Sequence, residues 1–406
     1  MQLFYWLIWL AGLLGHRKAK LLARGEAGAI AALKAAMDTD RLRNSHPIWI
    51  HVASVGEFEQ ARPIIEHLRQ AQPQRRIVLT FFSPSGYELR KNYDKVDFVG
   101  YLPCPTRRNA KRLLSIMQPS MALFVKYEFW PAYLKRLKKS GIPTYSISAI
   151  FRPRQLFFLP WGKSHLNLLR CFTHIYVQDE ASKDLLIKHG INHVSVAGDT
   201  RFDRVSQIAA QAKQLPLVER FVNQHPTTKV IIAGSTWPAD ELLLARYLEE
   251  HEDVVLVMAP HEIHEAHMHR IMHIFKGRFV RFTQAGEDSV SHVRLLIIDT
   301  IGMLSSIYRY GNVAYIGGGF GAGIHNTLEA AVYGIPVLFG PNHTHFREAL
   351  GLLKAEAAFT FNNYDEFAAC MDKALEQHQE IGKKAGDFVH NGIGATEFIY
   401  NELFNS

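Results

Sequence analysis

Short apolar runs recur along the chain from residue 48, and segments with helical periodicity separate most of them. The first group comprises residues 48–52, 77–82, 121–125, 144–147, 174–177 and 194–197. After a polar stretch at 206–228, a second group comprises residues 230–233, 254–258, 294–298, 313–316 and 337–339. Buried strands that alternate with helices are typical of doubly wound parallel sheets. The pattern therefore predicts an α/β protein with two Rossmann-like domains and a helical tail at 365–404.

The length of the chain fits this division, because 406 residues are many for a single hydrophobic core. We expect a membrane-associating segment at 1–15, a first domain at 16–205 and a second at 206–406, with the domains facing a central cleft. The three cysteines, Cys104, Cys171 and Cys370, are widely spaced. They favour a reducing compartment over a disulfide framework or a structural zinc site.

Charge is distributed unevenly along the chain. Residues 1–203 contain 30 Lys and Arg against 15 Asp and Glu, a balance of +15, whereas residues 204–406 have a balance of 16 − 23 = −7. The first half therefore favours an anionic partner, such as a phosphorylated lipid or a membrane surface. The sequence contains no RNA-binding or helix-turn-helix motif, so we expect no nucleic-acid partner.

The first fifteen residues, MQLFYWLIWLAGLLG, are almost entirely apolar, and a basic stretch follows them. They are too few for a typical membrane span and lack the cleavage site of a secretory signal. We interpret them as an interfacial helix or an uncleaved anchor that keeps the rest of the chain on the cytoplasmic side. The alternative is a helix packed on the first domain.

A glycine-rich loop follows the apolar run at 313–316. Its five glycines are Gly317, Gly318, Gly319, Gly321 and Gly323, and we expect a helix from 325 or 326 to 334. Strand, glycine loop and helix start together predict an anion site. Asn326 and Thr327 can cap the helix or donate to a ligand, and Glu329 can accept hydrogen bonds from a ribose. The alternative is a glycine-rich turn without a ligand.

Three charged residues follow other predicted strands, at the sheet edge where ligands bind in such folds. Glu57 lies near a helix start, which favours its anion and suits a general base. Glu128 follows the run at 121–125, and Arg201 follows the run at 194–197. The alternatives are a helix-dipole partner for Glu57, an ion pair with Lys126 or another of the many nearby bases for Glu128, and a surface salt bridge with Asp199 or Asp203 for Arg201.

Three further segments have more than one interpretation. The loop at 234–238, GSTWP, resembles a phosphate loop at a helix start. The segment at 151–172 mixes basic and aromatic residues, which suits phosphate recognition beside lipid or a buried amphipathic helix. The histidines between 261 and 273 lack the HExxH spacing and follow a strand, so we expect no metal site there.

Seven segments occur in an order that resembles one family. They are HVASVGE (51–57), KYEFWP (126–131), SISA (146–149), GDTRFD (198–203), AGSTWPADE (233–241), APHE (259–262) and GGGFGAGIHNTLEAAVYGIPVLFGP (317–341). Together they resemble the 3-deoxy-D-manno-octulosonic acid (Kdo) transferases of Gram-negative bacteria. The resemblance covers essentially the whole chain.

The resemblance implies an inverting glycosyltransferase of the GT-B fold that acts in lipopolysaccharide biosynthesis at the cytoplasmic side of the inner membrane. It implies transfer of Kdo from CMP-Kdo to a phosphorylated lipid A precursor (lipid IVA), without a metal or other cofactor. Glu57 would be the general base, and Glu128 and Arg201 would stabilise the transition state. The residues implied to bind CMP are Pro260, His261, Ile301, Gly302, Met303, Asn326, Thr327, Leu328 and Glu329.

Three positions depart from the family pattern. Arg201 replaces a frequent Lys, His261 a frequent Arg, and Met303 a frequent Glu, so we expect Ile301, Gly302 and Met303 to contact the nucleotide through the backbone. The alternative functions are a UDP-sugar transferase or a sugar-nucleotide epimerase, and a non-catalytic nucleotide-sugar binding protein. A soluble epimerase would not need the apolar N-terminus, and a binding protein would not need Glu57 and Glu128.

Overall fold

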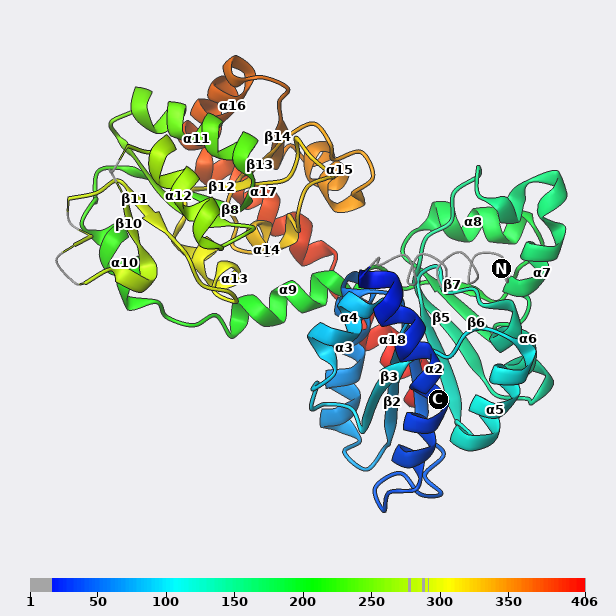
Figure 1. Cartoon of the computed structure of the whole chain (residues 1–406). Coiled ribbons are helices and arrows are strands. Elements are labelled where there is room, and N and C mark those ends of the chain that lie inside the picture. The colour runs from blue at the N-terminus through cyan, green and yellow to red at the C-terminus, as the bar shows by residue number, and fades with distance from the viewer. Residues whose placement is uncertain (1–16, 277–278, 287–288, 291, 406) are drawn as a thin grey trace. The chain divides into compact units, whose positions relative to one another are not determined.

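The computed structural model describes residues 17–276, 279–286, 289–290 and 292–405 (Figure 1). The chain forms two compact units. The first extends to Arg204 and takes in the chain from Ile393 onwards, and the second is Val205–Gly392. The apolar segment predicted at 1–15 lies outside the described residues. Among the helices of the described residues, none is both long and apolar enough to cross a bilayer.

The first unit is built on a seven-stranded sheet of order β3-β2-β1-β4-β5-β6-β7, in which every pair of neighbouring strands is parallel. Its strands are β1 (Ile48–Val52), β2 (Ile77–Phe81), β3 (Phe98–Tyr101), β4 (Met121–Val125), β5 (Thr144–Ala149), β6 (His174–Val177) and β7 (Val194–Val196). Its helices are α2 (Arg17–Met37), α3 (Val55–Ala71), α4 (Pro84–Arg90), α5 (Arg107–Met117), α6 (Pro131–Lys139), α7 (Lys163–Leu169), α8 (Glu180–Lys188) and α18 (Ala395–Phe404), and the short 3₁₀ turns η1 (Leu156–Phe158) and η2 (Pro160–Gly162) precede α7.

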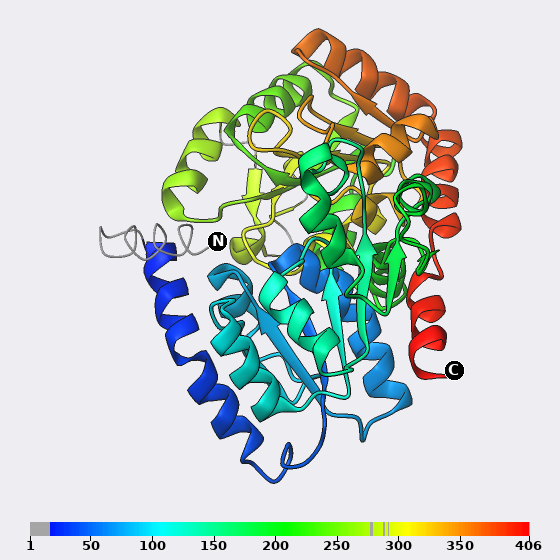
Figure 2. The ribbon, with the colours of Figure 1, turned by 90° about the vertical axis from the view of Figure 1, so that its right-hand side faces the viewer.

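The two faces of this sheet pack into separate cores, because successive side chains of a strand point in opposite directions. Trp49 on β1 belongs to one apolar cluster, whereas Ile48 and Ile50 on the same strand belong to the other. Helix α2 lies along the outside of this unit and packs against α5 and β3 (Figure 2). The central strands are therefore covered on both faces, as expected for a parallel sheet.

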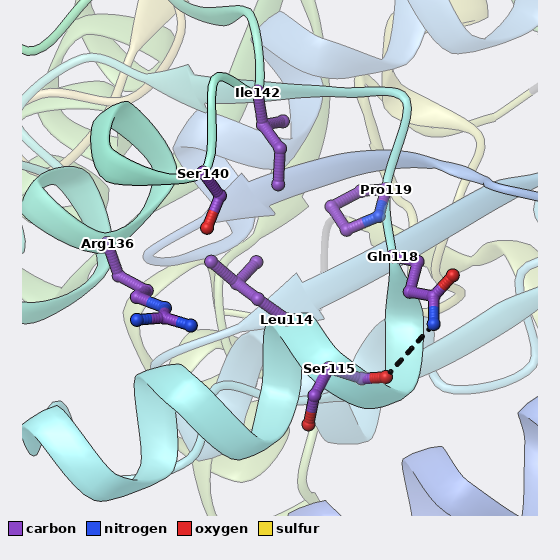
Figure 3. Close-up of a pocket in the computed structure, with 7 residues that line it drawn as sticks. All are labelled: Leu114, Ser115, Gln118, Pro119, Arg136, Ser140 and Ile142. Atoms are coloured by element: carbon purple, nitrogen blue, oxygen red, sulfur yellow. Dashed lines mark hydrogen bonds between the residues drawn. The ribbon is translucent and has the colours of Figure 1, made fainter.

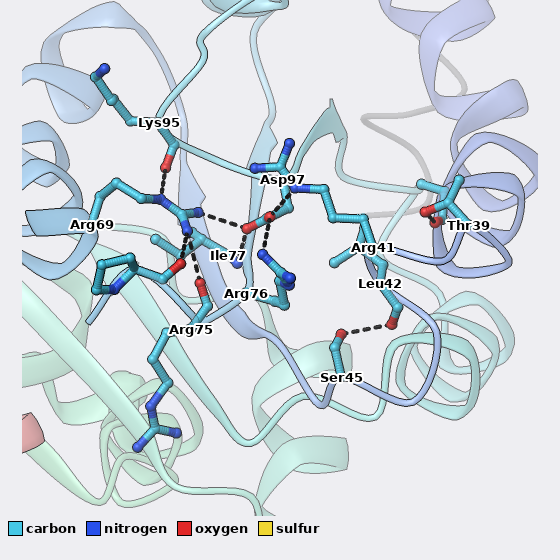
Figure 4. Close-up of polar contacts among 12 residues, drawn as sticks. Thr39, Arg41, Leu42, Ser45, Arg69, Arg75, Arg76, Ile77, Lys95 and Asp97 are labelled. Carbon is cyan, nitrogen blue, oxygen red and sulfur yellow. Dashed lines mark hydrogen bonds and ion pairs between the residues drawn. The ribbon is translucent and has the colours of Figure 1, made fainter.

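A buried carboxylate ties together the amino-terminal ends of two strands of the first unit (Figure 4). Asp97 immediately precedes β3, and its oxygens lie 2.5 Å from Arg41 Nε, 2.7 Å from Arg69 Nη2 and 3.4 Å from Arg76 Nη1. It also accepts the backbone N–H of Ile77 at 2.8 Å. Burial alone would raise the pKa of Asp97, but these donors and charges lower it.

The C-terminal helix α18 belongs to the first unit, so the domain predicted at 206–406 is corrected at this end. Asp203 accepts hydrogen bonds from the backbone N–H groups of Gly394 and Thr396, at 2.7 and 2.9 Å. It therefore satisfies donors at the start of α18 that a helix leaves unpaired. Ile399 and Tyr400 of α18 are buried in the same core as Ile48 and Ile50 of β1.

The second unit is built on a parallel sheet of order β10-β11-β9-β8-β12-β13-β14. Its strands are β8 (Lys229–Thr236), β9 (Val254–Pro260), β10 (Phe279–Arg281), β11 (Leu295–Ile297), β12 (Val313–Ile316), β13 (Val337–Phe339) and β14 (Ala358–Thr360). Its helices are α10 (Pro216–Asn223), α11 (Pro238–Glu250), α12 (Glu265–Ile274), α13 (Leu304–Ile307), α14 (Leu328–Ala331), α15 (Arg347–Lys354), α16 (Tyr364–Glu376) and α17 (His378–Asn391), with 3₁₀ turns η3 (Phe282–Gln284) and η4 (Tyr308–Tyr310). Helix α9 (Thr200–Ala210) spans the boundary between the units.

The two Rossmann-like α/β units and the helical tail agree with the sequence pattern, but some elements differ. The pattern missed β3, β10 and β14, which are edge strands of three or four residues. The polar stretch at 206–228 contains the end of α9 and all of α10. The helix predicted from 325 or 326 to 334 is the four-residue α14.

Replacing Asp203 with Ala should loosen α18, because several donors at its start lose a buried charged acceptor. Hydrogen bonds to charged groups contribute about 1.5–3 kcal/mol each. We expect faster amide hydrogen exchange in the peptide that contains α18, measured by mass spectrometry. Asp40→Ala is the control, because the side chain of Asp40 is 99% exposed. Unchanged exchange in α18 of the Asp203 variant would contradict this role.

Candidate active site

In each unit the strand order reverses at the centre of the sheet, between β1 and β4 in the first unit and between β8 and β12 in the second. Ligands of such sheets bind beyond the carboxyl ends of the strands at this switch point. The loops after these four strands therefore carry several of the candidate site residues, and the others follow neighbouring strands of the same sheets.

Glu57 lies in the first turn of α3, directly after β1. Its carboxylate accepts a hydrogen bond from the hydroxyl of Ser54, the N-cap residue. The side chain is partly buried, so it is held in place but can still be reached from solvent. The positive end of the helix dipole favours the carboxylate anion at this position.

Glu128 follows β4 and is only 9% exposed. Its Oε2 lies 3.0 Å from Nε2 of His51 on β1 and accepts the Nε1–H of Trp130 at 2.6 Å. These contacts, rather than the ion pair with Lys126 considered above, surround the carboxylate oxygen. His51 was predicted only as part of a motif and not as a site residue, because its partner Glu128 lies 77 residues away in the sequence.

Arg201 lies at the start of α9 and is held by Asp199. Its Nε and Nη2 both donate to Asp199 Oδ2, at 2.9 and 2.7 Å. Gln60 donates to the other oxygen of Asp199 at 3.1 Å. Burial would raise the pKa of Asp199, but the charge and hydrogen bonds of Arg201 lower it. One of the salt bridges expected as an alternative is thus formed, but it is largely buried rather than at the surface.

Three residues that are not glycine have left-handed backbone conformations at carboxyl ends of strands. Lys126, Ser148 and Ser235 have φ angles of +56°, +54° and +54°. Such conformations are unfavourable for residues with a Cβ and are common at functional sites. They lie at the ends of β4, β5 and β8, on the side of each sheet that carries the candidate site residues.

In the second unit three aromatic rings meet from loops that follow β8, β9 and β12. The rings of Trp237 and His261 stack with their centroids 4.6 Å apart, and the centroids of His261 and His325 are 4.5 Å apart. Trp237 Nε1 donates to His325 Nε2 at 3.3 Å. Of these residues, only His261 was predicted as a site residue. The GSTWP loop thus places an aromatic ring beside it.

The glycine-rich loop after β12 is held by a buried carboxylate. Asp240 accepts the N–H groups of Gly318 and Trp237, both at 2.9 Å, and the hydroxyl of Tyr315 at 2.7 Å. A Cβ on Gly317 would lie 2.3 Å from the Ser235 carbonyl oxygen. The glycines therefore allow backbones to pack closely. The helix predicted after the loop is corrected to one short helical turn, α14, whereas the anion site itself stays a prediction.

The other residues predicted to bind CMP lie around this edge of the second sheet. Asn326 donates from Nδ2 to Glu329 at 3.0 Å and accepts the Leu328 N–H at 3.1 Å. The remaining positions are Pro260 at the end of β9, the fully buried Thr327, Ile301 with 89% exposure, Gly302 with φ of +89°, and Met303 at the start of α13.

One group in the second unit has the side chains that a metal ion prefers. Glu262, His264 and His267 each offer a ligand atom within 4.8 Å of the others. His264 Nδ1, however, accepts the His267 N–H at 3.2 Å, and His267 Nε2 lies 2.8 Å from Glu241 Oε1. With these bonds the group serves as a cap for α12 and a buried carboxylate–imidazole pair. The absence of a catalytic metal remains a prediction.

A hollow of about 290 Å³ in the first unit lies near the amino-terminal ends of β4 and β5 (Figure 3). Gln118 and Pro119 precede β4, and Ile142 precedes β5. The other lining residues are Leu114, Ser115, Arg136 and Ser140. This hollow is therefore separate from the carboxyl-end loops that carry the candidate site residues.

Comparison with known proteins relates this arrangement to enzymes. Residues 26–204 match the family model described as 3-Deoxy-D-manno-octulosonic-acid transferase (kdotransferase). The 3-deoxy-D-manno-octulosonic acid transferase of Aquifex aeolicus is 28% identical over 342 residues, which cover 82% of this chain and 87% of the relative. The transferase of the same name from Haemophilus influenzae is 25% identical over 372 residues, which cover 88% and 86% of the two chains.

Solved structures share the fold. UDP-GlcNAc 2-epimerase from Neisseria meningitidis superposes with a TM-score of 0.62 at 16% identity, over 89% of this chain and 100% of the epimerase. A putative UDP-N-acetylglucosamine 2-epimerase from Listeria monocytogenes gives a TM-score of 0.61 at 14% identity, over 89% and 98%. These identities establish a common fold only.

The two Rossmann-like units and the sequence relatives define the protein as a glycosyltransferase. More particularly, the family model and the sequence relatives support a Kdo transferase, as the motifs predicted.

His325 should make folding stability depend on acid pH. Burial and the neighbouring His261 lower the pKa of His325 to about 4. An unfolded histidine binds its proton near pH 6.5, so acid favours the unfolded chain between about 6.5 and 4. We expect His325→Gln to lose less stability than the wild type over this range, measured by urea unfolding at several pH values.

The exposed His269 on α12 provides the control, and His269→Gln should follow the wild-type pH profile. Equal acid sensitivity of the His325 variant and the wild type would show that His325 is not held unprotonated in the folded state.

Proposed function

We propose that the protein transfers Kdo from CMP-Kdo to a hydroxyl of a phosphorylated lipid A precursor, lipid IVA, with inversion at the anomeric carbon. The observation that carries this proposal is the similarity to curated Kdo transferases over more than four-fifths of the chain. The solved epimerases share the fold at low identity, which gives a UDP-sugar reaction weaker support.

The two units would divide the work. In the first unit, Glu57 takes the proton of the acceptor hydroxyl while the oxygen of that hydroxyl bonds to the anomeric carbon of Kdo. The bond from that carbon to the CMP phosphate oxygen breaks, and CMP leaves with the electron pair. Glu128 and Arg201 stabilise the charges that develop, and both are held by buried partners that limit their movement.

The second unit would bind the nucleotide. Trp237, His261 and His325 offer ring surfaces next to one another, which suits contact with a base. Glu329, oriented by Asn326, would accept hydrogen bonds from the ribose hydroxyls. We propose that the transfer step needs no metal ion, so a chelator should leave kcat at saturating CMP-Kdo unchanged.

The acceptor would approach from the cytoplasmic face of the inner membrane. Trp161 is 73% exposed on η2, and the exposed basic residues Arg152, Arg154 and Lys163 lie near it in the sequence. Phe157 and Phe158 instead pack against the core of the first unit. The segment at 151–172 thus combines a buried aromatic part with an exposed part that suits a lipid headgroup region.

The direct test is to incubate the pure protein with CMP-Kdo and a tetra-acylated lipid A precursor and to determine the molecular mass of the lipid product by mass spectrometry. Addition of one or more Kdo residues is the expected result. A second reaction contains UDP-GlcNAc in place of CMP-Kdo. Epimerised UDP-GlcNAc without any lipid product would favour the epimerase function and overturn the proposal.

Glu57→Gln should lower kcat by about 10²–10⁴-fold, because it removes the base but keeps the shape of the side chain. CMP affinity, measured by calorimetry, should remain unchanged, since the nucleotide residues lie in the second unit. Glu59→Gln on the same helix is the matched control. Near-normal turnover of Glu57→Gln combined with loss in Glu128→Gln would reverse the two roles.

Trp161→Ala should weaken binding to anionic vesicles by roughly 3- to 10-fold, because less apolar surface enters the headgroup region. Binding of the wild type should also fall as salt rises, since the range of charge interactions shortens to about 8 Å at 0.15 M. Vesicle flotation measures both effects. Leu242→Ala, at another exposed apolar residue on α11, should bind as the wild type does. Equal binding of the Trp161 variant would remove this segment from the membrane surface.

A further inference from the structure

The buried His51 connects the two strands that flank the switch point of the first sheet. Its ring is 0% exposed. Nε2 lies 3.0 Å from Glu128 Oε2, and Nδ1 lies 2.9 Å from the hydroxyl oxygen of Thr80 on β2. The Thr80 hydroxyl in turn accepts the Nε1–H of Trp49 at 2.8 Å. Four side chains thus form one chain of hydrogen bonds that ends at the carboxylate.

The chemistry of the two ends assigns the protons along this chain. Trp49 Nε1–H can only donate, so the Thr80 hydroxyl accepts there and can direct its own proton towards His51 Nδ1. The Glu128 carboxylate, which already accepts the Nε1–H of Trp130, also accepts from His51, and this places a proton on Nε2. On the other side of the ring, Nδ1 also lies 3.1 Å from the backbone carbonyl oxygen of Thr80, which can only accept. The surroundings therefore specify the donor at Nε2, and Thr80 holds the Nδ1 side of the ring in place.

This assignment determines how Glu128 presents its charge. Within the residues that the structure describes, His51 and Trp130 both donate to Oε2. Oε1 is therefore the oxygen left to face a substrate. Two N–H donors on one oxygen fix the plane of the carboxylate and stabilise its negative charge. A carboxylate held in this way suits electrostatic stabilisation better than proton uptake.

We propose that His51 is a positioning residue for the transfer reaction, and that it orients Glu128 through its Nε2–H while Thr80 holds the Nδ1 side of the ring. The inference rests on the proposed function for its kinetic consequences, but the proton on Nε2 can be detected without activity. It adds to the site a residue that acts through Glu128 and does not touch the substrate.

Two substitutions of His51 separate hydrogen bonding from packing. The amide nitrogen of Gln can occupy the place of Nε2, whereas that of Asn reaches only the place of Nδ1. We expect His51→Asn to lower kcat by about 10- to 100-fold, with the KM for CMP-Kdo little changed. His51→Gln should recover most of the wild-type kcat. His390→Gln, at an exposed histidine on α17, is the control and should behave as the wild type.

The proton on Nε2 is detected by ¹⁵N NMR of histidine-labelled full-length protein, with His51→Gln used to assign the signal. We expect a protonated Nε2 in the wild type. Equal kcat of the Gln and Asn variants, or a bare Nε2, would overturn the proposal. A wild type that makes no Kdo–lipid product would overturn the proposed function instead, and the NMR result would still decide whether Nε2 carries the proton.

Discussion

Both sheets are wholly parallel, and this decides which residues can meet at the ends of their strands. All strands of a parallel sheet run in the same direction, so their carboxyl ends lie together and residues distant in the sequence become neighbours there. In the first sheet β1 pairs with both β2 and β4, and this brings His51, Thr80 and Glu128 into contact. In the second sheet β8 pairs with β9 and β12, and this brings the loops that carry Trp237, His261 and His325 together.

Buried carboxylates hold these loops in place. Asp240 bonds the N–H groups of Trp237 and Gly318 and so couples the loop after β8 to the loop after β12. Asp199 holds Arg201 and Gln60, and Asp203 holds the start of α18. Each of these carboxylates has several donors, which is the condition for keeping a charged group out of water. These hydrogen bonds therefore hold the loop segments from which the site residues extend.

The sequence predicted the central strands well, because each is a run of apolar side chains buried on both faces. It missed β3, β10 and β14, three edge strands whose three or four residues leave little apolar periodicity to detect, although it found the edge strand β7 of similar length. The helix after the glycine loop was predicted too long, since only the four-residue α14 forms there. The glycines allow close packing at Gly317 and Gly318, and a ligand at this loop stays a prediction.

The site residues show the same division between local and distant information. Glu57, Glu128 and Arg201 could be found from the sequence, because each follows a strand within a few residues. His51, Trp237 and His325 lie within quoted motifs, but their hydrogen-bond partners are 77 or 88 residues away, so the sequence did not show what they contact. Positions of this kind become visible only when the register of the strands is known.

The surroundings of the two glutamates support different roles for chemically identical groups. Glu57 is partly buried and has a hydroxyl donor, whereas Glu128 is buried and receives N–H donors from an imidazole and an indole on one oxygen. A base must be reached by the proton that it takes, which suits the more accessible carboxylate. A group that stabilises charge gains from being fixed before the reaction begins, which suits the carboxylate that the fold has immobilised. The proposed roles thus agree with the burial and donor chemistry at the ends of β1 and β4.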